Sequence, residues 1–138
     1  MKSILIIEDQ QNLRSVVKST LERLGYRVHE AGNGREGIEV YKRTAPDLVI
    51  TDLIMPEKEG LETIRDLKKM VPDVKIIAMT GAGRANSKDF LKMARLFGAA
   101  IALSKPFTFP ELAKSVEAMI GKAAPDDVGP GAVSPGMA

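Results

Sequence analysis

The sequence contains no cysteine and no tryptophan, and aromatic residues make up only 4% of it. The absence of cysteine excludes disulfides, thiolate catalysis and cysteine-ligated metal centres, and it fits a reducing compartment. So few aromatic side chains disfavour a surface on which nucleic-acid bases stack. The net charge of +2 is mild and no basic run is interleaved with aromatics, so we expect no direct contact with nucleic acid.

Long apolar runs are also missing. No run approaches the roughly 20 residues that cross a membrane. The N-terminal stretch MKSILIIEDQ lacks the longer apolar segment and the cleavage site of a signal peptide. We therefore expect a cytoplasmic protein with no membrane contact. The 138 residues correspond to about one domain, and a hydrophobic content of 44% is sufficient for a core.

Short apolar runs are present instead, and they recur along the chain. They lie at residues 4–7, 48–50, 74–79 and 99–103. Such runs are typical of strands that are covered on both faces. Residues 26–31 alternate more clearly between apolar and polar side chains, which indicates an edge strand.

Five helical patterns alternate with these runs, each with apolar residues three or four positions apart. They lie at residues 13–24, 34–44, 61–67, 90–97 and 112–120. Strand and helix thus alternate five times, which predicts an α/β fold with a doubly wound parallel sheet and helices on both faces. We expect this domain to span residues 1–121. Residues 122–138 are rich in Pro, Gly and Ala, so we expect a disordered tail there.

Carboxylates follow two of the predicted strands. Glu8 and Asp9 come directly after the first predicted strand, and Asp52 comes at the end of the third, which begins at Leu48. Sites in open parallel sheets form beyond the carboxyl ends of the strands, so we expect these acids to converge. Three adjacent carboxylates repel and raise one another's pKa values. Mg²⁺ prefers oxygen ligands and would relieve that repulsion, so the acids predict a magnesium site.

Two further polar residues follow strands at the same edge. Thr80 ends the fourth predicted strand, and Lys105 follows the fifth. An ammonium group can pair with Asp52 or with a phosphate oxygen, and a hydroxyl can donate to an anion. A carboxylate can act as a nucleophile and form an acyl phosphate. The set is therefore suited to placing a phosphoryl group on a carboxylate.

Four motifs in this order carry a family resemblance. They are Glu8-Asp9 after ILII, then DLVITDLIMPEKEG, IIAMTG and ALSKPF. With them, residues 2–121 resemble a response-regulator receiver domain of bacterial two-component signalling. The resemblance implies a flavodoxin-like fold of five parallel strands in the order 2-1-3-4-5 with five helices. It also implies a phosphoprotein that signals and is not an enzyme.

The resemblance implies a role for each residue of the site. Asp52 would accept a phosphoryl group from a phosphohistidine on a histidine kinase or a histidine phosphotransfer protein. Mg²⁺ would be held by Glu8, Asp9, Asp52 and the backbone carbonyl of Ile54. Thr80 and Lys105 would contact the phosphoryl oxygens, and the bond before Pro106 would be cis, as some X-Pro bonds are.

The chain departs from the family pattern in two places. Receivers usually carry Tyr or Phe three residues before the lysine, and this chain has Ala102 there. The segment between Thr80 and Lys105 is also longer than usual, with the extra length in residues 81–88. Both departures concern how a signal leaves the site, and neither concerns phosphorylation itself.

Other interpretations compete with this one. We expect no output domain after residue 121, so phosphorylation would change contacts with an output protein, in a monomer or weak homodimer. One alternative is a Mg²⁺-dependent phosphohydrolase with an Asp nucleophile, but such enzymes of the haloacid dehalogenase type place two Asp residues two positions apart where this chain reads EDQQ. Another is a receiver-like binding module that is never phosphorylated, and Glu8-Asp9 could then merely cap a helix.

Overall fold

A computed structural model describes residues 1–53, 59–80 and 87–123, and their side chains except those of 59 and 87–91. Within these ranges, strands and helices alternate along the chain as predicted. The elements are β1 (Ser3–Ile7), α1 (Gln11–Arg23), β2 (Arg27–Ala31), α2 (Gly34–Thr44), β3 (Leu48–Asp52), α3 (Glu59–Met70), β4 (Ile76–Thr80), α4 (Ser87–Phe97), β5 (Ile101–Ser104) and α5 (Phe109–Ile120).

The strands form one parallel sheet in the order β2-β1-β3-β4-β5. This confirms the flavodoxin-like fold class and the strand order, and it places β2 at an edge as its alternation indicated. The order changes direction between β1 and β3, which are neighbours although β2 lies between them in sequence. In folds of this kind a ligand site forms at that point, beyond the carboxyl ends of the strands.

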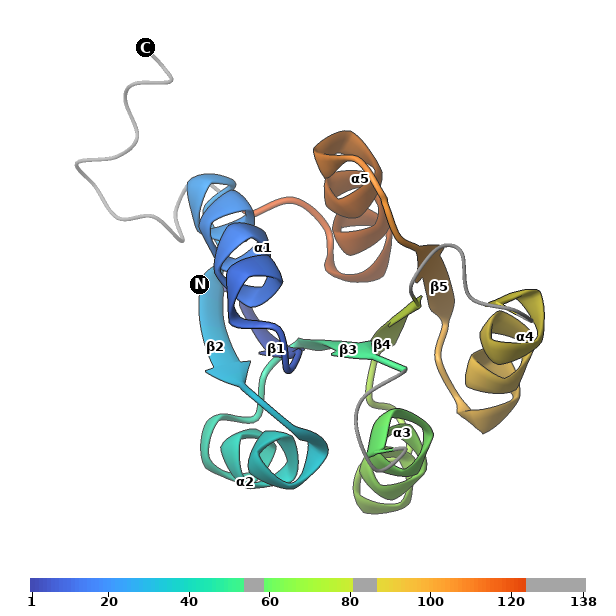
Figure 1. The fold of residues 1–138 in the computed structure, drawn as a ribbon. Helices are drawn as coiled ribbons and strands as arrows, with labels where there is room; N and C mark the ends of the chain where they lie inside the picture. Colours follow the sequence, from blue (N-terminus) through green and yellow to red (C-terminus); the bar gives the residue numbers. More distant parts are fainter. Residues whose placement is uncertain (54–58, 81–86, 124–138) are drawn as a thin grey trace, which may run out of the picture.

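Helices cover both faces of the sheet (Figure 1). On one face Ile4 and Ile6 pack in a core with residues of α1 and α5. On the other face Leu5 and Ile7 pack with residues of α2, α3 and α4. Because successive residues of a strand face opposite sides, covering both faces makes each central strand a continuous apolar run.

Several element boundaries differ by a few residues from the sequence prediction, and two of these differences have a clear local cause. Helix α5 begins at Phe109 and not at 112, because Thr108 and Glu111 form a reciprocal capping box. Strand β4 begins at Ile76 and not at 74, because the N–H of Val74 closes a turn onto the carbonyl of Val71.

Some sequence predictions fall on residues outside the described ranges. They concern most of the longer segment 81–88, the predicted tail from residue 124 onward, and the Ile54 carbonyl. Within the described ranges no helix has the length and apolar character needed to span a bilayer.

Candidate functional site

Three carboxylates meet at the carboxyl edge of the sheet. One oxygen each from Glu8, Asp9 and Asp52 lies within 4.8 Å of the others. Strands β1 and β3 pair in register up to Ile7 and Thr51, so the residues that follow reach the same level. Glu8 is fully buried and Asp52 is 4% exposed, whereas Asp9 faces solvent. The cluster therefore has two buried members and one accessible member.

Lys105 joins the two buried acids. Its Nζ lies 3.0 Å from Oε1 of Glu8 and 3.2 Å from Oδ2 of Asp52, and its side chain is 19% exposed. The N–H of Lys105 donates to the Thr80 carbonyl at 2.6 Å, which connects the residue to the end of β4. The Lys105–Pro106 bond is cis, which confirms that prediction. One ammonium group thus contacts a cluster of three carboxylates, and the site stays net negative when all are ionised.

The pKa of Glu8 is raised because this arrangement disfavours its ionised form. Burial, and then the nearby charge of Asp52, raise it from an ordinary 4.5 to about 7, although Gln10 and Lys105 donate hydrogen bonds to the carboxylate. A bound divalent cation would stabilise the ionised form. The donor set also suits Mg²⁺, because all three groups supply carboxyl oxygens and the exposed Asp9 gives solvent access to the cluster. The residues present therefore fit a magnesium ion.

Helix capping explains part of the contacts of Glu8. The N-cap of α1 is Gln10, whose own side chain makes no capping bond, and the first turn contains no acid. Glu8 accepts a hydrogen bond from the backbone N–H of this N-cap residue at 3.1 Å through Oε2. Its other oxygen, Oε1, pairs with Lys105, so Glu8 contacts both the start of α1 and the acidic site.

Thr80 lies at the end of β4 and is completely buried. Its Oγ1 has no hydrogen-bond partner within the described part of the chain. A buried polar group without a partner costs about 1–3 kcal/mol. This hydroxyl is thus able to donate to an anion at the rim, as the sequence suggested.

Ala102 occupies the position at which receivers usually carry an aromatic side chain. It is half-buried in β5 and pairs with Ala78 of β4. At this level of the two strands both side chains are single methyl groups.

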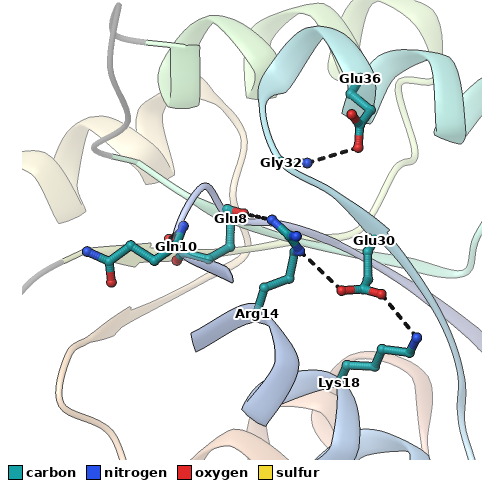
Figure 2. Close-up of polar contacts among 7 residues, drawn as sticks. All are labelled: Glu8, Gln10, Arg14, Lys18, Glu30, Gly32 and Glu36. Atoms are coloured by element: carbon teal, nitrogen blue, oxygen red, sulfur yellow. Dashed lines mark hydrogen bonds and ion pairs between the residues drawn. The ribbon is translucent and has the colours of Figure 1, made fainter. Parts of the chain in front are cut away.

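Sequence reasoning missed Arg14, which touches the backbone of the acidic cluster. Its Nη1 donates to the Glu8 carbonyl at 2.8 Å, and its Nε pairs with Glu30 Oε1 at 3.1 Å (Figure 2). Lys18 reaches the other oxygen of Glu30 at 3.0 Å. The available signal was a pair of basic residues four positions apart on α1, opposite an acid near the end of a neighbouring strand.

Comparison with known proteins agrees with the fold and the motifs. A profile described as "Response regulator receiver domain" matches residues 4–117. The chain is 37% identical over 100 residues to a chemotaxis protein CheY of Thermotoga maritima. This alignment covers 65% of this chain and 83% of that protein.

Two crystal structures illustrate the likeness in three dimensions. A response regulator receiver domain protein from Clostridium thermocellum is 31% identical with a TM-score of 0.80, over 87% of this chain and 94% of that one. The response regulator TrrA from Thermotoga maritima, in complex with Mg²⁺-BeF, is 33% identical with a TM-score of 0.76, over 87% of this chain and 100% of that one.

Proposed function

Because the chain belongs to the response regulator receiver family, as its motifs predicted, we propose that it is a phosphoacceptor whose Asp52 takes a phosphoryl group. The observation that carries this proposal is the cluster of Glu8, Asp9 and Asp52 with Lys105 bridging the two buried acids. Asp52 ends a buried strand, so a rigid backbone presents its carboxylate at the rim of the sheet.

The proposed step is a transfer between two nucleophiles. A carboxylate oxygen of Asp52 attacks the phosphorus of a phosphohistidine, forming a P–O bond as the P–N bond breaks. The imidazole nitrogen leaves with the electron pair of that bond and takes up a proton. The product on this chain is an acyl phosphate.

Glu8, Asp9 and Asp52 would hold Mg²⁺, with the Ile54 carbonyl as the further ligand that the family resemblance implies. When bound, the ion supplies positive charge that offsets the phosphoryl oxygens. Support comes from the distances among the three acids, from the raised pKa of Glu8, and from the relative TrrA, which was crystallised with Mg²⁺-BeF.

Lys105 and Thr80 would hold the transferred group. The Lys105 ammonium contacts Glu8 and Asp52 in the structure, and a short rotation about its flexible stem would direct it to a phosphoryl oxygen on Asp52. The buried Thr80 hydroxyl would donate to another phosphoryl oxygen in a charge-assisted hydrogen bond. Both residues therefore stabilise the charge that arrives with the phosphoryl group.

The wider setting follows from the family. Receiver domains of two-component systems work with histidine kinases or histidine phosphotransfer proteins, and we assign this chain a phosphodonor of that class. Residues 1–121 would form the receiver, residues 122–138 a tail, and the signal would pass by changed contacts to an output protein. We place the protein in the cytoplasm, as a monomer or weak homodimer, and regard it as a signalling protein and not an enzyme.

The test is phosphorylation by a small donor. With Mg²⁺ and acetyl phosphate, the intact mass of the chain should rise by one phosphoryl group, and the label should be lost with EDTA and in Asp52→Asn. Asp66→Asn is the matched control, because Asp66 is an exposed acid on α3. Undiminished labelling of Asp52→Asn would overturn the assignment. Sustained release of phosphate at many turnovers per chain would instead favour the phosphohydrolase.

A further inference from the structure

The peptide unit between Glu8 and Asp9 carries one carboxylate of the acidic cluster at each end. The N–H of Glu8 donates to the Ala31 carbonyl at 3.1 Å, which extends the β1–β2 pairing by one group. The Glu8 carbonyl lies past this pairing, and it accepts a hydrogen bond from Arg14 Nη1 at 2.8 Å. Rotation of this peptide would redirect both carboxylates, so the contact to its carbonyl bears on the geometry of the whole cluster.

Arg14 is itself held in place. Its Nε pairs with Glu30 at 3.1 Å, Glu30 is held from its other side by Lys18 at 3.0 Å, and the Arg14 side chain is only 18% exposed (Figure 2). Hydrogen bonds from Lys18, and secondarily from Arg14, keep the pKa of Glu30 below its usual value. The fork of the guanidinium can thus bond a carboxylate of β2 and the Glu8 carbonyl at once, which an ammonium group cannot do in the same geometry.

The neighbouring loop leaves space for this guanidinium. A Cβ added to Gly32 would make only an ordinary 3.5 Å contact with Arg14 Nη1, so this loop lies directly beside the guanidinium without crowding it. The N–H of Gly32 donates to Glu36 Oε1 at 3.0 Å, which fastens the loop to the first turn of α2. Arg14 therefore lies between two fixed segments, the end of β1 and the loop after β2.

We infer that Arg14, held by Glu30, is a positioning residue that orients the Glu8–Asp9 peptide for metal binding. This inference rests on the proposed magnesium site. Removing Arg14 should change the Mg²⁺ affinity in opposite directions depending on whether Arg14 acts by its charge or by orienting the peptide. By charge alone, a cation beside the site weakens binding of Mg²⁺, so its removal would tighten binding. Through orientation, its removal weakens binding, and loss of such supporting contacts typically costs about 10–100-fold in metal affinity.

The experiment is a calorimetric titration of the whole chain with Mg²⁺. Arg14→Met should bind Mg²⁺ about tenfold more weakly than the unsubstituted protein. Lys18→Met is the matched control, because it removes the same unit charge from the same ion-pair group, and Lys18 donates its hydrogen bond to Glu30, whereas the donor to the Glu8 carbonyl is Arg14. It should change the affinity by no more than about twofold. Equal or tighter binding by Arg14→Met would overturn the inference.

A second measurement needs no metal. In the Mg²⁺-free protein, hydrogen exchange followed by NMR should be faster in Arg14→Met at the amides of Glu8 and Gln10, which donate to the Ala31 carbonyl and to Glu8 Oε2, while the amides in the middle of β1 and β3 keep their protection. Unchanged exchange at Glu8 and Gln10 would contradict the positioning role. If Arg14→Met does not fold, Arg14→Lys takes its place, since it keeps the charge and loses the fork; wild-type affinity in that variant would likewise overturn the inference.

The outcomes also separate this inference from the function on which it rests. If the unsubstituted protein neither binds Mg²⁺ nor is labelled at Asp52, the proposed function fails and the inference fails with it. If the unsubstituted protein binds and is labelled while Arg14→Met behaves in the same way, only the role of Arg14 is wrong.

Discussion

At the scale of single residues, Glu8 links the stability of the fold to the chemistry of the site. Its carboxyl is completely buried and its pKa is raised to about 7, first by burial and then by the charge of Asp52. A group whose pKa is higher in the folded state than in the unfolded chain stabilises the fold fully below its unfolded pKa, here 4.5. That contribution is lost as the pH rises through about 7.

We therefore expect the free energy of unfolding of the Mg²⁺-free protein to contain a component that falls between pH 4.5 and 7. A shift of this size corresponds to at most about 3 kcal/mol. Urea unfolding across this pH range should show the decline, and Glu8→Gln should flatten it. Mg²⁺ should stabilise the protein more at pH 8 than at pH 5, because the ligands must be ionised to bind it. A pH profile unaffected by Glu8→Gln would contradict this account.

Sequence reasoning could reach some residues of the site and not others, for a geometric reason. Glu8 and Lys105 follow strands and Asp52 ends one, and parallel strands end at one edge, so strand assignment alone brings these residues together. Arg14 lies on a helix, and its contact to the site is to a backbone carbonyl, which has no signature in a sequence; only its pairing with Glu30 had one. That the Thr80 hydroxyl has no hydrogen-bond partner among the described residues is likewise visible only when the surrounding atoms are placed.

At the scale of elements, the start of α3 packs directly on the end of β3. A Cβ added to Gly60 would lie 2.5 Å from the carbonyl oxygen of Asp52 and would also meet the Leu53 backbone. Real side chains do not tolerate such distances, and the atoms involved belong to the backbone that presents Asp52. The glycine at the end of the DLVITDLIMPEKEG motif thus has a steric role, whereas its position in the sequence indicated only a helix start.

Gly60→Ala should therefore destabilise the fold by about 1–3 kcal/mol, the usual cost of overpacking, although alanine favours helices more than glycine does. It should also slow acetyl phosphate labelling, because Asp52 moves with its carbonyl. Urea unfolding and intact mass would measure the two effects. Gly32→Ala is the steric control for the unfolding measurement, since its added Cβ makes only an ordinary 3.5 Å contact. Equal stability of the two variants would show that the helix start yields without cost.

Boundaries of elements were less predictable than their order. The order follows from alternating patterns and the preference for short right-handed connections, which leave few topologies open. Boundaries depend on local bonds, such as the capping box of Thr108 and Glu111 that starts α5 three residues before its apolar pattern. That box has a sequence signature and could have been predicted, whereas the turn that delays β4 depends on backbone contacts around Val74.

At the scale of the whole molecule, the end of α5 is fastened to the opposite edge of the sheet from the acidic site. The last carbonyls of a helix have no partners within it. Here Lys75 Nζ donates to the Met119 carbonyl at 3.0 Å, Lys2 donates to that of Ile120, and the Tyr26 hydroxyl donates to that of Gly121 at 2.7 Å. These donors lie beside the amino ends of β4, β1 and β2. The C-terminal helix thereby connects strands that are distant in sequence.

This connection predicts where the chain can be shortened. A chain of residues 1–123 should keep its melting temperature within about 2 °C and keep Mg²⁺-dependent labelling at Asp52, because the two core clusters of the described residues end at Ala123. A chain of residues 1–118 loses Met119, Ile120 and all three hydrogen bonds, so it should lose about 2–4 kcal/mol. Thermal melts of both chains would measure the difference.

The two truncations distinguish between accounts of the domain boundary. If residues 1–118 melt at the same temperature as residues 1–123, the bonds to Lys2, Tyr26 and Lys75 contribute nothing and the fold ends with the second-last turn of α5. If residues 1–123 already melt far below the full chain, residues 124–138 belong to the folded unit and the predicted tail is wrong. Only when the first chain is stable and the second is not does the domain end where α5 meets the amino edge of the sheet.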